Sequence, residues 1–178
     1  MRKPFPNSSI SVGHDLCPGD IGYITYMHAT LYAPEQGWDY TFDIYVAIPL
    51  AEFAQSQSQS QFQSPSPSPS PRERIWILKD GDRIVGSVAI VKCSEEQAQL
   101  RWLLLEPEIR GRGIGRWLVE EATDFSRISG YKSIFLWTVD TLYIAANLYR
   151  SVGFVQKERL THEIWGSTVT EVKYELLL

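Results

Sequence analysis

A stretch rich in glycine and arginine, Arg110–Arg116 (RGRGIGR), constrains most strongly how this chain of 178 residues can fold. It stands between an apolar run that ends at Leu105 and a segment, Gly113–Ser129, whose apolar residues recur at helical spacing. This order predicts a strand, a tight loop and a helix with one buried face. Glycines let backbone N–H groups approach an anion, and a helix N-terminus adds its dipole, so the loop suits a pyrophosphate.

The segments around this loop predict a layered α/β domain. Asp80-Gly81-Asp82 lies between two β-prone runs, Arg74–Lys79 and Arg83–Cys93, which is typical of a hairpin. The further expected elements are strands at Gln97–Leu105, Ile134–Thr138, Phe154–Thr161 and Val169–Leu177, and a helix at Leu142–Val152. Hairpins combined with two crossover helices indicate a mixed sheet.

The N-terminal part predicts one strand and two helices. Gly22–His28 is β-prone, residues 29–35 are expected to be helical, and a second helix is expected from Asp39 to about Ala54. Residues 1–19 are interpreted as an N-terminal extension and residues 20–178 as one domain, because about 35 residues cannot form an independent core.

An uncharged segment, Gln55–Pro71 (QSQSQSQFQSPSPSPSP), interrupts that domain and has one large apolar residue, Phe62. It cannot bury enough surface to offset the entropy of ordering, so we expect a flexible insert. Its Ser-Pro repeats also suit a ligand for a proline-binding module. A neutral expanded loop is favoured, because the basic residue that flanks such ligands is missing until Arg72.

Charge and composition exclude several classes of function. Residues 1–71 hold six acidic and two basic residues, whereas residues 72–178 hold 15 of each, and the pI is about 5.4. This balance argues against nucleic acid as a partner. Two cysteines, Cys17 and Cys93, without ligand-like spacing give no metal site. Because no apolar run suits a membrane span or a signal peptide, we expect a cytoplasmic protein without a membrane partner.

Three kinds of phosphate-binding loop are compatible with glycines before a helix. A P-loop needs a lysine, which this stretch lacks. A dinucleotide-binding oxidoreductase needs a third glycine where Arg116 stands, and the preceding hairpins are atypical for it. The acyl-CoA loop [QR]-x-x-G-x-[GA] is matched in full by Arg110, Gly113 and Gly115.

With this loop and the later motif Leu148-Tyr149-x-x-x-Gly153-Phe154, the chain resembles the GNAT superfamily of acetyl-CoA-dependent N-acetyltransferases over about residues 20–178. The stretch from His28 to Asp39 is most similar to the acetyltransferase half fused to MarR-type regulators. The resemblance implies a GNAT-like fold, a mixed, mostly antiparallel sheet flanked by helices. It also implies acetyl-CoA as donor without a metal, direct transfer to a primary amine of a small molecule or peptide, and a fold that allows a homodimer. A catalytically silent acyl-CoA-binding module is the alternative.

The resemblance also assigns the cofactor contacts. The backbone of the strand before the loop would bind the pantetheine arm and the thioester carbonyl, and the loop amides would hold the pyrophosphate. The residues in these positions are Leu103, Leu104 and Leu105 on the strand, and Arg110, Gly111, Arg112, Gly113, Ile114 and Gly115 in the loop.

The remaining assignments are catalytic and acceptor residues. By resemblance Tyr149 would protonate the leaving thiolate, and Leu142 stands where many relatives carry a cofactor-contacting asparagine. The candidates for the base are His28, Glu35, Glu158 and His162, and the two histidines are the ones assigned to the catalytic set. The acceptor would meet the first two helices, where Tyr32, Glu35 and Trp38 lie. The excess of acid there favours a cationic acceptor.

Overall fold

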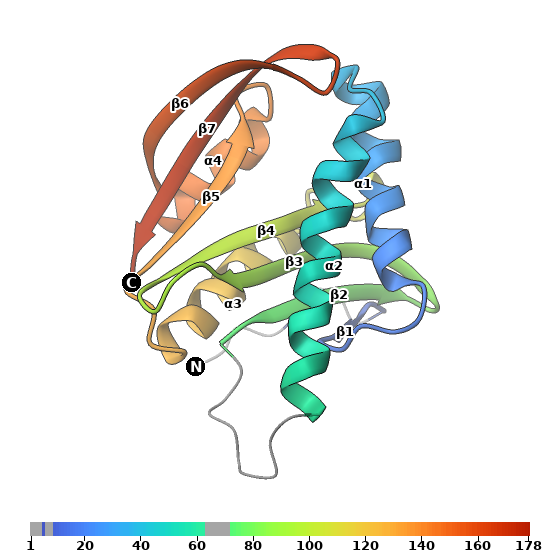
Figure 1. Cartoon of the computed structure of the whole chain (residues 1–178), viewed down its shortest axis with the longest axis vertical. Helices are drawn as coiled ribbons and strands as arrows, with labels where there is room; N and C mark the ends of the chain where they lie inside the picture. The colour runs from blue at the N-terminus through green and yellow to red at the C-terminus, as the bar shows by residue number, and fades with distance from the viewer. Residues whose placement is uncertain (1–4, 6–8, 63–71) are drawn as a thin grey trace. The chain divides into compact units, whose positions relative to one another are not determined.

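The computed structural model describes Phe5 and residues 9–62 and 72–178. Its order of elements agrees with the predicted one, with a first strand in a different place (Figure 1). In chain order the elements are β1 (Ser11–Gly13), α1 (Asp20–Gln36), α2 (Thr41–Phe62), β2 (Arg74–Asp80), β3 (Arg83–Lys92), β4 (Gln97–Leu105), the 3-10 turn η1 (Pro107–Ile109), α3 (Ile114–Ile128), β5 (Ser133–Val139), α4 (Tyr143–Val152), β6 (Val155–Ile164) and β7 (Ser167–Leu177).

The strands form one seven-stranded sheet in the order β1-β2-β3-β4-β5-β7-β6. The β4–β5 pair is parallel, whereas β1–β2, β2–β3, β3–β4 and β5–β7 are antiparallel. The predicted α/β class with a mixed, mostly antiparallel sheet is therefore confirmed.

The chain divides into two compact parts. The sheet unit comprises Met1–His14, Arg72–Thr161 and Thr170–Leu178, and the helical unit comprises Asp15–Pro71 and His162–Val169. The β6–β7 hairpin thus has its base in the sheet unit and its tip in the helical unit.

The core of the sheet unit lies between the strands and the helices α3 and α4. Ile114, Leu118 and Ala122 form the buried face of α3 at the spacing that the sequence predicted. Trp76 of β2 meets Phe125 of α3 edge to face, with ring centroids 5.6 Å apart. Each large apolar side chain buried in this way contributes about 1.5–3 kcal/mol.

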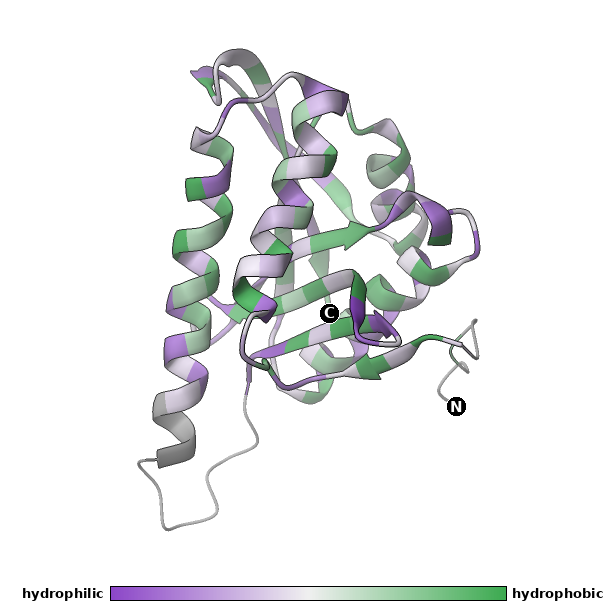
Figure 2. Cartoon of the chain, turned by 90° about the vertical axis from the view of Figure 1, so that its right-hand side faces the viewer, coloured by the Kyte–Doolittle hydropathy of each residue, from purple (hydrophilic) through white to green (hydrophobic). Residues whose placement is uncertain are grey.

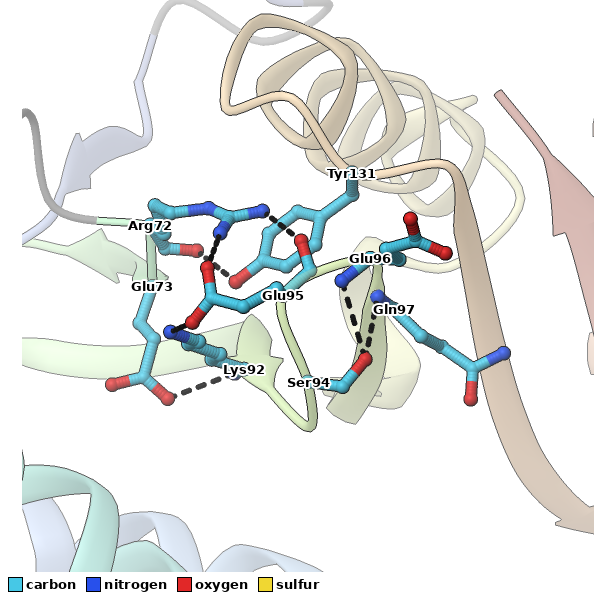
Figure 3. Close-up of polar contacts among 8 residues, drawn as sticks. All are labelled: Arg72, Glu73, Lys92, Ser94, Glu95, Glu96, Gln97 and Tyr131. Carbon is cyan, nitrogen blue, oxygen red and sulfur yellow. Dashed lines mark hydrogen bonds and ion pairs between the residues drawn. The ribbon is translucent and has the colours of Figure 1, made fainter.

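A polar cluster fastens the start of β2 to the turn between β3 and β4 (Figure 3). The Arg72 guanidinium donates to a Glu95 carboxylate oxygen at 2.7 Å and to the Glu95 backbone oxygen at 2.6 Å, and it lies 4.2 Å from the centre of the Tyr131 ring. The Tyr131 hydroxyl donates to the Arg72 backbone oxygen at 3.0 Å. Burial raises the pKa of Tyr131 to about 12, so the hydroxyl stays a donor at neutral pH.

In the helical unit, α1 runs without a break from Asp20 to Gln36, so the strand predicted at Gly22–His28 was wrong. Ile24, Met27 and His28 are buried at helical spacing, and this pattern outweighs the β-propensity of the neighbouring residues. The helix ends at Gly37, whose φ of 73° is the left-handed conformation that glycine accepts easily.

Helix α2 continues through Phe62, beyond the point at which the sequence indicated a flexible insert. Its serine hydroxyls bond back to the helix: Ser56 Oγ donates to Phe53 O at 2.8 Å and Ser58 Oγ to Gln55 O at 2.9 Å. Figure 2 shows hydrophobic colour along the first part of α2 and hydrophilic colour toward its C-terminal end. The rest of the predicted insert, residues 63–71, lies outside the described residues.

The tip of the β6–β7 hairpin is held in the helical unit by aromatic contacts. The ring centroid of Trp165 lies 4.5 Å from that of Trp38, 4.9 Å from Phe42 and 5.0 Å from Tyr45. Trp165 and Gly166 have φ angles of 53° and 74°, as in the tight two-residue turns that twisted hairpins favour. Aromatic pairs of this kind each contribute about 0.5–1.5 kcal/mol beyond the area they bury.

His28 is 4% exposed in α1, and its Nδ1 lies 2.8 Å from the backbone oxygen of Ile24. Because a carbonyl only accepts, Nδ1 carries the proton and donates. Burial lowers the pKa of His28 from 6.5 to about 4.

Acidification is therefore expected to destabilise the fold through His28. The unfolded chain protonates this side chain near pH 6.5, whereas the folded chain resists protonation until about pH 4. The free energy of unfolding should fall as the pH decreases through this window, by about 3 kcal/mol in total. Urea titrations at a series of pH values measure the slope.

The variant H28Q should flatten the pH dependence in this window, whatever its effect on stability at neutral pH. H14Q, at a more exposed histidine, controls for the loss of a histidine side chain as such. An H28Q slope equal to that of the unmodified chain would assign the pH dependence to another group.

Candidate active site

The parallel strands β4 and β5 part after a short common stretch, as Figure 1 shows. Among the described residues, their register pairs run from Gln97–Ser133 to Gln99–Phe135 and go no further. Beyond that point β4 stays paired with β3, and β5 stays paired with β7. The end of β4 therefore presents a strand edge to which an extended ligand can hydrogen-bond as an added strand.

Strand β4 is bulged directly before this edge. Trp102 has a φ of 51°, and the β3–β4 register shifts between Ser87 and Ala89. Opposite the strand end lies Gly86, where a Cβ would come within 2.6 Å of Leu105 Cδ2 and 3.0 Å of Leu104 O. A side chain at this position would make close contacts with the end of β4, so a glycine suits the close approach of β3 and β4.

The segment Arg110–Arg116, called the Gly-Arg loop below, follows the end of β4 and leads into α3. Gly111 and Gly113 have φ angles of 75° and 80°, and Gly113 is the N-cap of α3. Arg110 and Arg112 are exposed, and Arg110 Nε donates to Leu105 O at 2.8 Å. A glycine cap leaves the first helical amides without a side-chain acceptor from the cap, so the loop can bind an anion.

Gly115 fits α3 against both α4 and β4. A Cβ there would lie 3.3 Å from Leu148 Cδ2 and 3.5 Å from Leu105 Cδ1. The neighbour of Leu148 in α4 is Tyr149, which is 5% exposed, with its ring centroid 6.1 Å from that of Tyr174. The predicted acid is thus buried on a helix that touches the start of α3.

The sheet unit brings the predicted cofactor residues together on one continuous segment. Leu104 is buried, and Leu103 and Leu105 are half-buried against the core. Arg110–Gly115 follows the 3-10 turn η1, and before this turn the Glu106 N–H donates to Val85 O of β3 at 2.8 Å. Their roles as cofactor contacts stay predictions.

The helical unit holds the other predicted residues. Trp38 is 8% exposed and packs 5.3 Å from Tyr32, centroid to centroid, in the aromatic cluster, whereas Glu35 is exposed near the end of α1. His162 is half-buried in the hairpin tip. The pKa of His28, lowered by burial to about 4, makes its imidazole a weak base at neutral pH.

A separate hollow of about 320 Å3 lies between α3 and α4. Its lining includes Trp117, the three acidic residues Glu120, Glu121 and Asp124, and one basic residue, Arg127, which pairs with Asp124 at 2.9 Å. Carboxylates repel phosphates, so the hollow is a poor alternative to the Gly-Arg loop for a polyanion.

Within residues 9–62 and 72–178, no three His, Cys, Asp or Glu side chains are arranged to share a metal ion. No helix in that part of the chain combines the length and apolar character that crossing a bilayer requires.

Sequence reasoning missed two features of this region. The pair Gly86-Ser87 interrupts an otherwise apolar strand and was a signal of close backbone approach. The dipeptide Trp165-Gly166 between two strands was a turn signal, but its aromatic partners lie far away in the sequence.

Curated relatives match part of the chain. Human N-acetyltransferase 8B is 29% identical over 99 residues, which cover 53% of this chain and 44% of that protein. An N-acetyltransferase of Schizosaccharomyces pombe, named as uncharacterized, is 41% identical over 64 residues, 36% of this chain and 39% of that protein. The matches therefore span less than half the length of these relatives.

Solved structures share the fold over nearly the whole chain. The acetyltransferase yncA of Salmonella typhimurium, solved with acetyl-CoA, has a TM-score of 0.67 at 14% identity, covering 96% of this chain and 95% of that one. Spermidine N-acetyltransferase of Vibrio cholerae, in complex with CoA and spermine, has a TM-score of 0.65 at 20% identity and covers 96% of each chain. The model of the acetyltransferase (GNAT) family matches residues 38–154, which include β4, the Gly-Arg loop and α3. By its sequence and its fold, the chain belongs to the acetyltransferase (GNAT) family.

Proposed function

We propose that the chain is an N-acetyltransferase that moves the acetyl group of acetyl-CoA directly to a primary amine while both substrates are bound. The observation that carries the proposal is the parting of β4 and β5 beyond Gln99, beside an exposed Gly-Arg loop, in a chain of the GNAT family. The naming of relatives as N-acetyltransferases, and of yncA as bound to acetyl-CoA, supports this choice of reaction and donor.

The residues present fit a CoA thioester. Backbone amides of Arg110–Gly115 would hold the pyrophosphate at the helix N-terminus, with Arg112 and Arg116 adding positive charge. The edge of Leu103–Leu105 would bind the amide groups of the pantetheine arm. A backbone N–H at the end of this edge would stabilise the oxyanion that develops on the thioester.

Acetyl-CoA supplies an activated thioester, whose C–S bond is exchanged for a C–N bond to the amine. A base must take a proton from the amine, and an acid must give one to the thiolate. The phenol of Tyr149 is the proposed acid. His162 is preferred to His28 as the base, because the pKa of about 4 that burial gives His28 is far below neutral pH.

The distribution of charge supports a cationic acceptor. All 17 Lys and Arg residues belong to the sheet unit, and the helical unit has none. The acidic residues of the helical unit are Asp15, Asp20, Glu35, Asp39, Asp43, Glu52 and Glu163. A surface of one sign attracts the opposite charge. The fold likeness to a spermidine N-acetyltransferase is consistent with an amine of this kind.

Other expectations stay proposals. The relatives and structures named above are acetyltransferases, so the finer likeness to the half fused to MarR-type regulators rests on the stretch from His28 to Asp39 alone. A homodimer and a cytoplasmic location likewise stay predictions. Tyr32, Glu35 and Trp38 are the proposed acceptor contacts.

A panel of amines tests the reaction and its acceptor class. With acetyl-CoA, we expect thiol release with spermidine and with a lysine-containing peptide, at a kcat/KM about tenfold or more above that with glutamate. The preference should weaken as salt is added, because exposed charges are screened. A thiol-trapping assay measures each rate.

The charge variant E35Q should lower kcat/KM for spermidine, whereas D82N, at an exposed acid in the β2–β3 turn of the sheet unit, should not. CoA binding without thiol release for any amine would favour the silent acyl-CoA-binding module. Thiol release only with hydroxyl or anionic acceptors would contradict the proposed class of acceptor.

The variant G115V should weaken CoA binding by about tenfold or more, because its side chain would push α3 away from Leu105 and Leu148 and displace the loop amides. Isothermal titration with CoA measures the Kd. G22A, at a helical glycine with open space around it, is the control and should leave the Kd unchanged. Equal affinity for CoA in G115V and in the unmodified chain would indicate that the loop does not bind the cofactor.

The variant Y149F should reduce kcat by about ten- to a hundredfold while the Kd for CoA stays near its original value, because the change removes a proton donor and keeps the packing. Steady-state kinetics with spermidine and titration with CoA measure the two quantities. Y174F, at the buried neighbour 6.1 Å away, is the matched control. Equal turnover in Y149F and Y174F would remove Tyr149 from the mechanism.

A further inference from the structure

The bulge at Trp102 depends on a side chain of the neighbouring strand. Ser87 of β3 is 0% exposed, and its Oγ donates to the backbone oxygen of Trp102 at 2.7 Å. Both ends of this hydrogen bond are buried, because Trp102 is itself 7% exposed. A buried hydroxyl–carbonyl pair is costly to break, since the carbonyl then loses its partner without gaining water.

This hydrogen bond falls at the point where the β3–β4 ladder changes register. Ser87 pairs with Leu104, whereas Ala89 pairs with Arg101, so Val88 faces two residues of β4. Trp102 is one of these two and has a φ of 51°, which a tryptophan adopts only when its surroundings impose it. The hydroxyl of Ser87 therefore donates to the residue whose backbone departs from the ordinary ladder.

The bulge affects the orientation of the three residues that follow it in β4. A bulge rotates the strand that follows it and re-aims its backbone groups. Leu103, Leu104 and Leu105 follow directly, and the register that Ser87 sets continues to the Gly86–Leu105 pair. Their edge is the one that no longer pairs with β5.

We propose that Ser87 is a positioning residue for the acyl donor: its hydroxyl holds the bulge at Trp102 and thereby sets where the edge of Leu103–Leu105 meets the pantetheine arm and the thioester. The inference rests on the proposed function, since it assigns that edge to the donor. Ser87 itself touches no substrate and acts through the backbone of β4. The Gly-Arg loop lies beyond this segment and holds the phosphates by its own amides.

The test separates the two halves of CoA. In S87A the Kd for CoA and the KM for acetyl-CoA should rise by about tenfold, because the strand edge loses its position. The Kd for 3′-phosphoadenosine 5′-diphosphate, which lacks the pantetheine arm, should stay within about twofold, because the loop amides are unchanged. Titrations at a temperature where each variant is fully folded measure both.

Two variants make the result specific. S126A removes another 0% exposed serine hydroxyl, which donates to Ala122 O at 2.8 Å inside α3, and it should change neither Kd. S87T keeps the hydroxyl and should restore the affinity for CoA. If S87A does not fold, S87C replaces it, because the thiol keeps the volume with a weaker donor.

An S87A chain that binds CoA as S126A does would overturn the inference and leave the proposed function intact. Equal losses for CoA and for the nucleotide in S87A would overturn it as well, since they would indicate a general distortion. An unmodified chain that binds neither ligand would overturn the proposed function and this inference together.

Discussion

The site depends on the point at which a parallel strand pair stops pairing. Strands β4 and β5 share three register pairs and then separate, while each keeps its antiparallel partner on the other side. A sheet normally satisfies the hydrogen-bonding groups of its central strands within itself. Here the end of a central strand is available to a ligand, next to a helix N-terminus. Every proposal for donor binding follows from this arrangement.

Two local conditions keep that edge in place. Gly86 lets β3 lie close to the end of β4, where a Cβ would stand 3.0 Å from Leu104 O, and the Ser87 hydroxyl donates to the backbone oxygen of Trp102. Arg110 adds a hydrogen bond to Leu105 O from the loop side. In the proposed reaction, these contacts would hold the edge in position before the thioester binds. The helical unit has an excess of acidic residues, whereas all Lys and Arg residues belong to the sheet unit. The acceptor and the donor of the proposed reaction likewise carry opposite charges.

The sequence was informative wherever local chemistry decides the structure. The alternation of β4, the Asp-Gly hairpin and the glycines of Arg110–Gly115 act over a few residues, and their elements lie where they were predicted. Gly22–His28 became part of a helix because buried positions at helical spacing outweighed β-propensity. The hydrogen bond at the Trp102 bulge and the aromatic contacts of Trp165 involve partners distant in the sequence, which no local pattern can identify.

We propose that the donor binds along the edge of β4 beyond Gln99, where β5 no longer pairs with it. A crystal structure of the chain with CoA tests it most directly. We expect the pyrophosphate on the amides of Arg110–Gly115 and the pantetheine arm alongside Leu103–Leu105, in the place that a neighbouring strand would take. CoA bound elsewhere, for example in the acidic hollow between α3 and α4, with no part of it between β4 and β5, would contradict this mode of donor binding.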